Sequence, residues 1–432
     1  MTAEIVIMNK EAVALAADSA VSLVTGTEEN PQKILTSANK IFRLSSSHTV
    51  AFMIFNNAAF LGIPWEPLIT RFGDSLGPAP LPGLADYADR FLVFLKSEQE
   101  LITPDIERQY FTSLIYSYYL SFRQIFQQNS MEIIRVQGVI SEDQIGDIVA
   151  EKINEIYTQI NGAGSVPGID QSLIKELSAA YDDITTRGIA EVFEQLPIPD
   201  TARAQLKEIP FLFFGKYPGP LDPMAQNFSG MVIAGFGEKE IFPSLVTYAI
   251  EGRLSGALKY KETENKKITF GTSAYVIPFA QREMVDIFMS GIDPRLTNAL
   301  VESLSEIFHE YPNAIVDSIE TLNDEEKSAL KKQFQPQSDV LVERISTYID
   351  NYRTSNTGPV INVVMSLPKA ELAAMAESLV NLTSLKQKVS LQAETVGGPV
   401  DVAIISKRDG FVWIKKKHYF REEINMHVVK RV

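Results

Sequence analysis

The chain has 432 residues and a formal net charge of −14. This acidic balance argues against a nucleic-acid-binding protein, because phosphates are neutralised by clustered Lys and Arg. The chain contains no Cys, which excludes disulfides, cysteine nucleophiles and thiolate metal sites. Apolar residues make up 45% of the sequence, enough for a sizeable core. We expect no signal peptide and no membrane span, since no apolar run reaches ~18 residues, and therefore a cytoplasmic protein.

The residue types that usually bind metals or cofactors are sparse. The four His, at positions 48, 309, 418 and 427, show no His-x-x-x-His spacing, so we expect no metal site. The nucleophile elbow of serine hydrolases and the phosphate-binding P-loop motif are both missing from the sequence. We interpret Gly235-Phe236-Gly237 as a strand-to-turn feature and Lys415 to His418 as a solvated strand end. The sequence thus predicts no metal and no organic cofactor.

The first residues predict a β-hairpin that carries a candidate nucleophile. An apolar strand from Thr2 to Met8, a turn at Asn9-Lys10 and a second strand from Glu11 to Asp18 follow one another. Thr2 directly follows Met1, and a Thr exposed at a mature N-terminus carries a nucleophile and a base, because its α-amine has a reference pKa of about 7.7–8.0. The alternative is an ordinary hairpin with a surface Thr and a turn Asp.

The next part of the chain changes from strands to helices. A loop is predicted at 25–37. The segments that follow it, 39–44 and 49–60, resemble two strands and the start of a helix in the proteasome-type family that the Thr2 to Asp18 layout also resembles. From Trp65 to about Gly215 the apolar residues recur at helical spacing, with helix starts at Thr103 and Ser141. We expect the aromatic residues there to form helix core rather than a substrate channel.

The second half repeats this alternation. The segments 231–237, 242–250 and 268–274 resemble later strands of the same family and its loop before a helix, with a turn at Glu251-Gly252 and an apolar helix pattern after Ala274. A helical stretch runs from about Pro278 to Tyr352 with a polar break at Asn323–Glu326. Residues 360–418 are predicted to be rich in strands, with a Gly397-Gly398 loop and a terminal hairpin of 402–405 and 411–414 around a turn at 408–410.

These strand segments resemble proteasome β-subunits and the proteasome-like peptidase subunits of bacterial ATP-dependent proteases. The Thr2 to Asp18 layout carries most of the resemblance, and the Gly397-Gly398 loop with its hairpin supports it. The resemblance implies an α+β fold, a four-layer αββα Ntn-hydrolase sandwich, interrupted by two helical insertions. The implied segments are 1–64 (first part of the core), 65–228 (helical insertion), 229–290 (second part of the core), 291–358 (smaller helical insertion) and 359–432 (last part of the core and C-terminal tail).

The resemblance also implies a set of site residues. Thr2 would be the nucleophile and Asp18 its supporting carboxylate. Lys40 matches the family's catalytic Lys by local context, whereas Lys33, the less favoured choice, matches the family's count better. The remaining implied positions are the backbone N–H groups of Phe55, Asn56 and Asn57 for the oxyanion hole, Thr272 at the family's loop Ser, and Glu394 one residue from the family's second Asp.

Together these features predict a threonine-type N-terminal-nucleophile (Ntn) hydrolase of amides or peptides. Two alternatives stay open: a catalytically inactive proteasome-like scaffold or interaction subunit, and an Ntn amidase or acylase acting on a small molecule. The resemblance implies a homo-oligomer, either a two-fold dimer or a larger ring, with an ATPase unfoldase or another protein as partner. We expect neither nucleic acid nor membrane as a partner.

Overall fold

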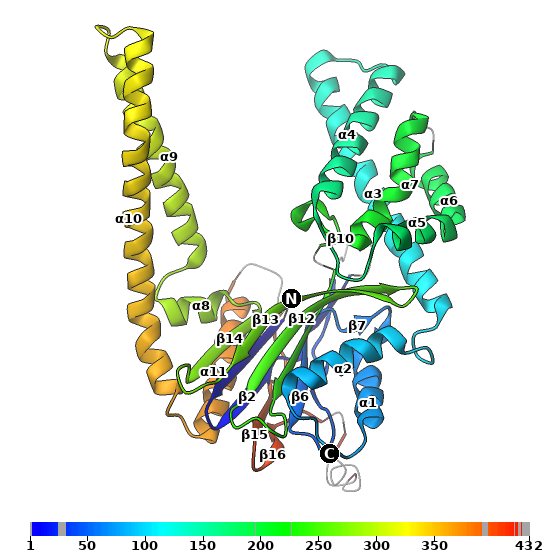
Figure 1. Cartoon of the computed structure of the whole chain (residues 1–432), viewed down its shortest axis with the longest axis vertical. Helices are drawn as coiled ribbons and strands as arrows, with labels where there is room; N and C mark the ends of the chain where they lie inside the picture. Colours follow the sequence, from blue (N-terminus) through cyan, green and yellow to red (C-terminus); the bar gives the residue numbers. More distant parts are fainter. Residues whose placement is uncertain are drawn as a thin grey trace. The chain divides into compact units, whose positions relative to one another are not determined.

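The structure is a computed structural model (Figure 1) that describes residues 2–24, 32–194, 196–225, 227–390, 396–418, 420, 421 and 425. For residues 22–24 and 32–34 only the backbone is described. Within these residues the fold is mixed α+β, with eleven α-helices and several β-sheets. The chain divides into unit 1, residues 1–55, 234–244 and 266–432, and unit 2, residues 56–233 and 245–265.

The main sheet of unit 1 is antiparallel and has the strand order β14-β1-β2-β15-β16. Its strands are β1 (Ala3–Asn9), β2 (Ala12–Ala17), β14 (Ala274–Ala280), β15 (Asp401–Ser406) and β16 (Gly410–Lys415). The N-terminal and C-terminal hairpins predicted from the sequence are therefore confirmed.

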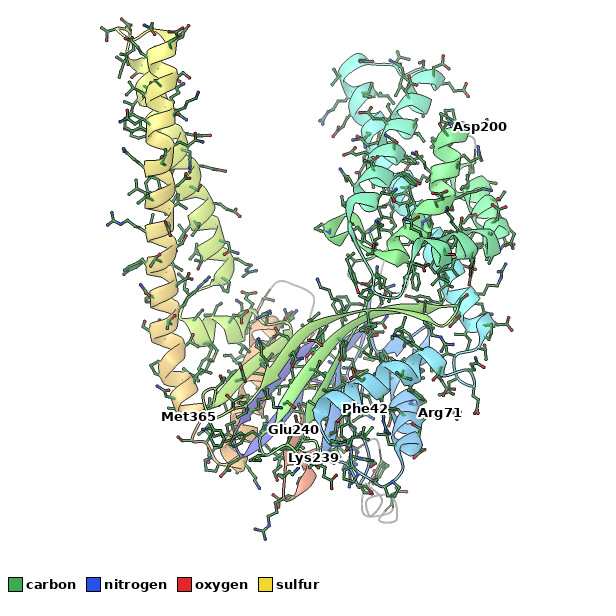
Figure 2. The ribbon with its side chains drawn as sticks, in the orientation of Figure 1. Phe42, Arg71, Asp200, Lys239, Glu240 and Met365 are labelled. Atoms are coloured by element: carbon green, nitrogen blue, oxygen red, sulfur yellow. The ribbon has the colours of Figure 1, made fainter. Side chains whose placement is uncertain are left out.

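Asn9 explains why the chain turns after β1. Its side-chain oxygen accepts hydrogen bonds from the backbone N–H groups of Glu11 at 2.9 Å and Ala12 at 3.3 Å, which is the local bonding by which Asn favours turns. Its amide group donates to the carbonyls of Val364 at 3.0 Å and Leu367 at 2.9 Å. Met365, which follows Val364 in the chain, marks the end of a long helix in Figure 2, so the Asn9 side chain fixes both the hairpin turn and this helix end.

The prediction of a helix directly after Ala274 is wrong. Residues 274–280 form β14, which pairs with β1 from Asn9↔Ala274 to Ala3↔Ala280, and helix α8 (Glu283–Ser290) begins only afterwards. Pro278 is compatible with this strand because β14 lies at the sheet edge, where a missing N–H costs little. The strand predicted at 268–274 is largely a turn, in which the Thr269 N–H donates to the Thr272 carbonyl.

One face of this sheet is covered by helices. The alternate residues Ala3, Ile5 and Ile7 of β1 are buried in one apolar cluster with residues of α8, α11 (Lys369–Lys388) and the end of α10 (Asp324–Val364). The strand-rich segment predicted at 360–418 is thus partly wrong, since α10 and α11 occupy it up to residue 388. The other residues of β1, including Glu4, point to the opposite face.

On that opposite face, β5 (Ile41–Arg43) lies near β2 and pairs with β6 (Val50–Asn56). Phe42 marks β5 in Figure 2. The strands predicted here are confirmed, but the predicted helix start at residues 56–60 is wrong. The chain first forms a small hairpin of β7 (Ala59–Phe60) and β8 (Ile63–Pro64), and α1 begins at Trp65. β3 (Val21–Val24) and β4 (Gln32–Leu35) pair with each other in antiparallel orientation.

The helical prediction for residues 65–215 is confirmed. The Thr103 hydroxyl accepts from the Ile106 N–H, and Ser141 forms a capping box with Gln144, so both predicted helix starts hold. The aromatic residues Phe111, Phe122 and Phe126 are buried in a common apolar core. The helices are α1 (Trp65–Leu76), α2 (Leu84–Ser97), α3 (Pro104–Gln137), α4 (Glu142–Gly162), α5 (Gln171–Ala180), α6 (Asp182–Phe193) and α7 (Asp200–Gly215).

Strands complete unit 2. β13 (Ala257–Lys267), β12 (Ser244–Leu254) and β11 (Ser229–Gly235) are neighbours in that order. β12 and β13 are joined by Ser255 and Gly256, which have φ of 50° and 78°. The turn predicted at Glu251-Gly252 is therefore wrong, because those residues lie inside β12. Short elements are β9 (Gly164–Ser165), β10 (Lys216–Tyr217) and the 3-10 helix η1 (Gly219–Leu221).

Two long helices of unit 1, α9 (Pro294–Ser318) and α10, pack against each other. The predicted break between them is confirmed, and Asn323 begins α10 with a capping box to Glu326. Across the described part of the chain, none of the helices combines the length and the apolar character that crossing a membrane requires.

Candidate active site

A buried lysine between two carboxylates lies at the start of the β1–β2 hairpin. Lys40 precedes β5, and its Nζ atom lies 2.5 Å from Asp18 Oδ1 and 3.1 Å from Glu4 Oε1. The exposed fractions of the side chains are 4% for Lys40 and 0% for both carboxylates. Charges this well buried are costly to desolvate and must be mutually paired, so the three side chains form one electrostatic unit.

Asp18 holds the site together through the backbone. Its Oδ1 atom accepts the Ala3 N–H at 3.1 Å, and its Oδ2 atom accepts the N–H groups of Gly397 at 2.9 Å and Ala20 at 3.3 Å. The Asp18 N–H in turn donates to the Ala3 carbonyl at 3.1 Å. The carboxylate therefore ties the beginning of β1, the end of β2 and the Gly397-Gly398 loop to Lys40.

Thr2 lies directly before β1 and is only 3% exposed. Its carbonyl accepts the Gln281 N–H at 3.0 Å, which fixes the residue against the end of β14. Its hydroxyl forms no hydrogen bond of normal geometry, yet it lies close enough to Glu4 for their interaction to lower the pKa of that carboxyl. The Thr2 hydroxyl therefore lies near the Glu4 carboxylate without the alignment of a full hydrogen bond.

Glu4 is the site residue that sequence reasoning missed. Burial raises its pKa to about 7; Lys40 acts against this shift, and the Asp18 charge adds to it. The signal was present in the sequence, because Glu4 is the only charged residue in the otherwise apolar run Ala3 to Met8. An acidic residue in a strand buried on both faces requires a partner, and Lys40 supplies it.

The Gly397-Gly398 loop lies beside Asp18 and Ser19. The Gly397 carbonyl accepts the Ser19 N–H at 3.2 Å, and the Ser19 hydroxyl donates to the Pro399 carbonyl at 2.5 Å. Gly398 has φ of 79°, and a Cβ there would lie 2.9 Å from the Thr36 carbonyl oxygen. The second glycine is thus required both by its backbone conformation and by the close approach of the chain.

The positions implied for the oxyanion hole differ in their surroundings. The Phe55 ring lies 5.1 Å from that of Phe279, the cross-strand neighbour of Glu4, so Phe55 is in the vicinity of the site. Asn56 has φ of 66°, and its side chain donates to the Phe228 carbonyl. The Asn57 N–H donates a hydrogen bond to the same carbonyl at 3.3 Å, so in this structure it already has an acceptor.

Thr272 does not belong to the site, which corrects its implied role. It is exposed and lies in the turn before β14, whose Ala274 is paired with Asn9. Thr2 is at the other end of β1, so the two residues are separated by the length of the strand, about 20 Å at ~3.3 Å per residue. The Lys33 side chain and Glu394 lie outside the described residues.

The cluster holds one Lys and two carboxylates rather than a set of metal ligands. Among the described residues, no group of three or more His, Asp and Glu side chains is placed to bind a metal ion. In comparisons with known proteins, no family model and no curated protein sequence matches the chain.

Proposed function

We propose that this chain is a threonine-type N-terminal-nucleophile hydrolase of amide or peptide bonds, with Thr2 as its nucleophile once Met1 is removed. The observation that supports the proposal is the buried Asp18–Lys40 ion pair, which the Ala3 N–H ties to the start of β1, directly after the buried Thr2. The resemblance to proteasome β-subunits implies these three residues as the nucleophile and its partners, and they come from segments 38 residues apart in the chain.

The proposed chemistry follows from this cluster. The Thr2 hydroxyl passes its proton to the Thr2 α-amine as its oxygen attacks the amide carbonyl, and the Lys40 ammonium favours the deprotonated forms of both groups. The leaving amine takes the proton as the C–N bond breaks, and water then hydrolyses the acyl ester. We place the oxyanion at the backbone N–H groups of Phe55 and Asn56, whose role needs no particular side chain.

We also propose a more detailed description of the fold. We assign a four-layer Ntn sandwich with the segment boundaries 1–64, 65–228, 229–290, 291–358 and 359–432. Support comes from the antiparallel sheet covered by α8 and α11 on one face, and from the β5–β6 hairpin on the other. We further propose a cytoplasmic homo-oligomer with an ATPase unfoldase or another protein as partner.

A second candidate, an interaction subunit without catalysis, is favoured by exposed apolar side chains on two helices. Leu300, Ile307 and Tyr311 of α9 are 44%, 53% and 66% exposed, and Tyr348 of α10 is 74% exposed. Such residues gather where proteins bind partners. The third candidate, a small-molecule amidase or acylase, shares the nucleophile but requires an enclosed pocket rather than an oligomeric chamber.

The experiment begins with the intact mass of the protein purified from its native host, which should lack Met1. The chain is then tested against fluorogenic peptides and small acyl amides, together with Thr2→Ala and Thr2→Ser. Ala permits removal of Met1 as Thr does, so the first variant isolates the hydroxyl, and we expect it to be inactive while Thr2→Ser keeps measurable turnover. Retention of Met1, or full activity of Thr2→Ala, would contradict the proposal and favour the interaction subunit.

A further inference from the structure

We infer that Glu4 is a second proton acceptor for the Thr2 hydroxyl, so that a buried side chain shares the role of base with the α-amine. This inference rests on the proposed hydrolase function and extends it to a residue that the resemblance to proteasome subunits does not include. It gives the chain a base that does not depend on a free N-terminus.

The strand geometry brings the two residues together. Successive side chains of a strand alternate between faces, so residues 2 and 4 point to the same side of β1, away from the helix-covered face that buries Ala3 and Ile5. The Glu4 carboxylate has no exposed surface. Apart from the Lys40 ion pair at 3.1 Å, neither of its oxygens has a hydrogen-bond partner of normal geometry. A buried acceptor in this state, beside a hydroxyl, is placed to receive a proton.

The two carboxylates receive unequal numbers of stabilising contacts. Asp18 has the shorter contact to Lys40 and accepts three backbone N–H groups, whereas Glu4 has the longer contact alone. On the same face, the cross-strand neighbours of Glu4 are the uncharged Phe279 and Ala17. Two strands away from Glu4, the Asp401 carboxylate is already paired with Lys417.

Glu4 receives none of the backbone N–H hydrogen bonds that would hold its carboxylate ionised. Burial raises the pKa of Glu4 to about 7, which places its proton exchange near neutral pH. A general base is most effective when its pKa is close to the working pH, and Glu4 meets that condition.

The steps balance without any other reagent. The Thr2 hydroxyl proton moves to the Glu4 carboxylate as the Oγ–C bond forms and the carbonyl π electrons move to oxygen. When the carbonyl re-forms and the C–N bond breaks, Glu4 returns the proton to the leaving amine. Water then attacks the acyl ester, gives one proton to Glu4, and Glu4 passes it back to Thr2 Oγ as the ester bond breaks.

The test uses Glu4→Gln in the full chain, because glutamine keeps the shape and removes the titration. The matched control is Glu11→Gln, an exposed acid of the same hairpin. Two quantities are measured between pH 4 and 9. The first is the rate at which a β-lactone, an acylating probe, modifies Thr2, as detected by intact mass. The second is the urea concentration at the midpoint of unfolding. We expect Glu4→Gln to lower the acylation rate at neutral pH by about 10²-fold or more and to shift the acid limb of its pH profile, while Glu11→Gln changes neither.

The unfolding measurement reports on Glu4 whether or not the protein is an enzyme. A carboxyl whose folded pKa is raised binds its proton more tightly in the folded state, so the stability it contributes is present at low pH and is lost as pH rises from about 4.5 to about 7. This loss should be present in the wild type and missing in Glu4→Gln. Glu4→Asp, a second variant that keeps a shorter carboxylate, should keep the pH dependence of stability while acylating more slowly.

The outcomes separate the two levels of the proposal. If Thr2 is acylated at the same rate and with the same pH profile in Glu4→Gln as in the wild type, the inference about Glu4 is wrong and the hydrolase proposal stands. If Thr2 does not react in any form of the protein, the proposed function itself is wrong, and the role of Glu4 falls with it. A wild-type stability that does not change between pH 4.5 and 7 also contradicts the inference.

Discussion

At the scale of single residues, Lys40 is the cation on which two buried carboxylates depend. Asp18 and Glu4 are both fully buried and both paired with its ammonium group. Its loss would leave both carboxyl groups buried without a cation. Breaking a buried pair in this way typically costs about 3–5 kcal/mol, so a variant at Lys40 is tested for stability as well as for activity.

We therefore predict that Lys40→Ala lowers kcat by about 10²-fold or more, the usual effect of removing an electrostatic or acid–base partner. Turnover is measured with the best substrate from the Thr2 experiments, and circular dichroism establishes how much of the protein is folded. Lys33→Ala is the control, and we expect it to change kcat little. The reverse ranking of the two variants would mean that Lys33 is the catalytic lysine.

Gly398 offers a second prediction at this scale. Gly398 and Gly410 both have positive φ, 79° and 69°, but a Cβ at Gly398 meets Thr36 at 2.9 Å whereas one at Gly410 meets nothing within 4 Å. In both Ala variants a positive φ strains the backbone, which costs about 1–2 kcal/mol of stability. Only Gly398→Ala adds a steric clash, which costs about 1–3 kcal/mol more.

Urea denaturation of the two variants measures the difference. We expect Gly398→Ala to be the less stable by at least about 1 kcal/mol and to lose Thr2 reactivity, because the neighbouring Gly397 N–H is bonded to Asp18. Equal stability of the two variants would show that the loop moves away from Thr36 without cost.

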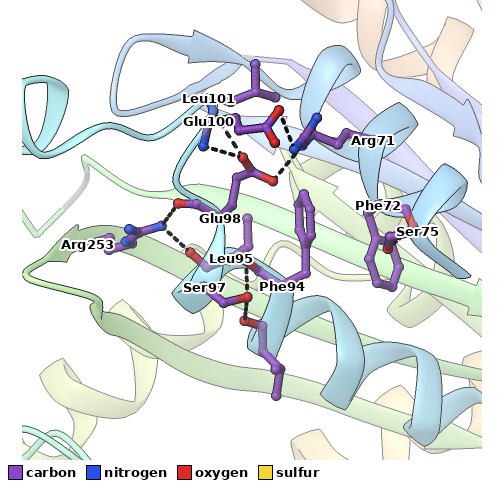
Figure 3. A network of polar contacts seen from close by, with 11 residues as sticks. Arg71, Phe72, Ser75, Phe94, Leu95, Ser97, Glu98, Glu100, Leu101 and Arg253 are labelled. Carbon is purple, nitrogen blue, oxygen red and sulfur yellow. Dashed lines mark hydrogen bonds and ion pairs between the residues drawn. The ribbon is translucent and has the colours of Figure 1, made fainter.

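At the scale of secondary-structure elements, Arg253 joins β12 to two helices of unit 2; Figure 3 shows its contacts with the end of α2. Its guanidinium donates to the carbonyls of Leu95 at 2.8 Å and Glu98 at 2.5 Å, at the end of α2, and pairs with Glu107 of α3 at 2.5 Å. Arg253 satisfies helix-end carbonyls that have no partner within the helix. Glu98 also pairs with Arg71 of α1 at 2.7 Å, but the Arg71 side chain is 40% exposed.

The two arginines provide a matched comparison. We predict that Arg253→Ala destabilises the protein by about 3–5 kcal/mol, because it leaves Glu107 buried without its cation. Arg71→Ala should destabilise the protein much less, since solvent screens its ion pairs. Thermal unfolding of both variants tests this, and a similar loss in each would indicate that burial of Arg253 does not decide its contribution.

At the scale of the whole molecule, the exposed apolar residues of α9 and α10 bear on assembly. Leu296, Leu300, Ile307, Tyr311 and Ile315 follow one another along α9 at spacings of four and seven residues, which places them on one helix face. The chain carries many acidic groups, and an apolar stripe within such a surface is typical of a contact with another protein.

We predict a homo-oligomer, with a two-fold dimer as the commonest closed form and a ring as the alternative. Light scattering coupled to size exclusion at micromolar concentration measures its mass. Tyr311→Asp should reduce that mass, whereas Val93→Asp, at an exposed apolar residue of α2, should leave it unchanged. A monomeric wild-type chain would contradict the prediction and favour the small-molecule amidase or the inactive scaffold over a chambered protease.

Local chemistry made several elements predictable from the sequence. The Asn9 turn, the helix starts at Thr103, Ser141 and Asn323, and the C-terminal hairpin depend on side chains that bond to backbone groups within three residues. Such contacts need no distant partner, so periodicity and capping residues were sufficient to place these elements.

The remaining strand and site residues are determined by contacts between residues that are distant in the sequence. Residues 274–280 are apolar without a clear period, and they form a strand because β1 offers them a free edge. The same register moves Thr272 away from Thr2. Glu4 joins the site because Lys40, distant in sequence, is buried beside it. Its pKa depends on burial and on neighbouring charges, and those are properties of the folded arrangement rather than of the residue itself.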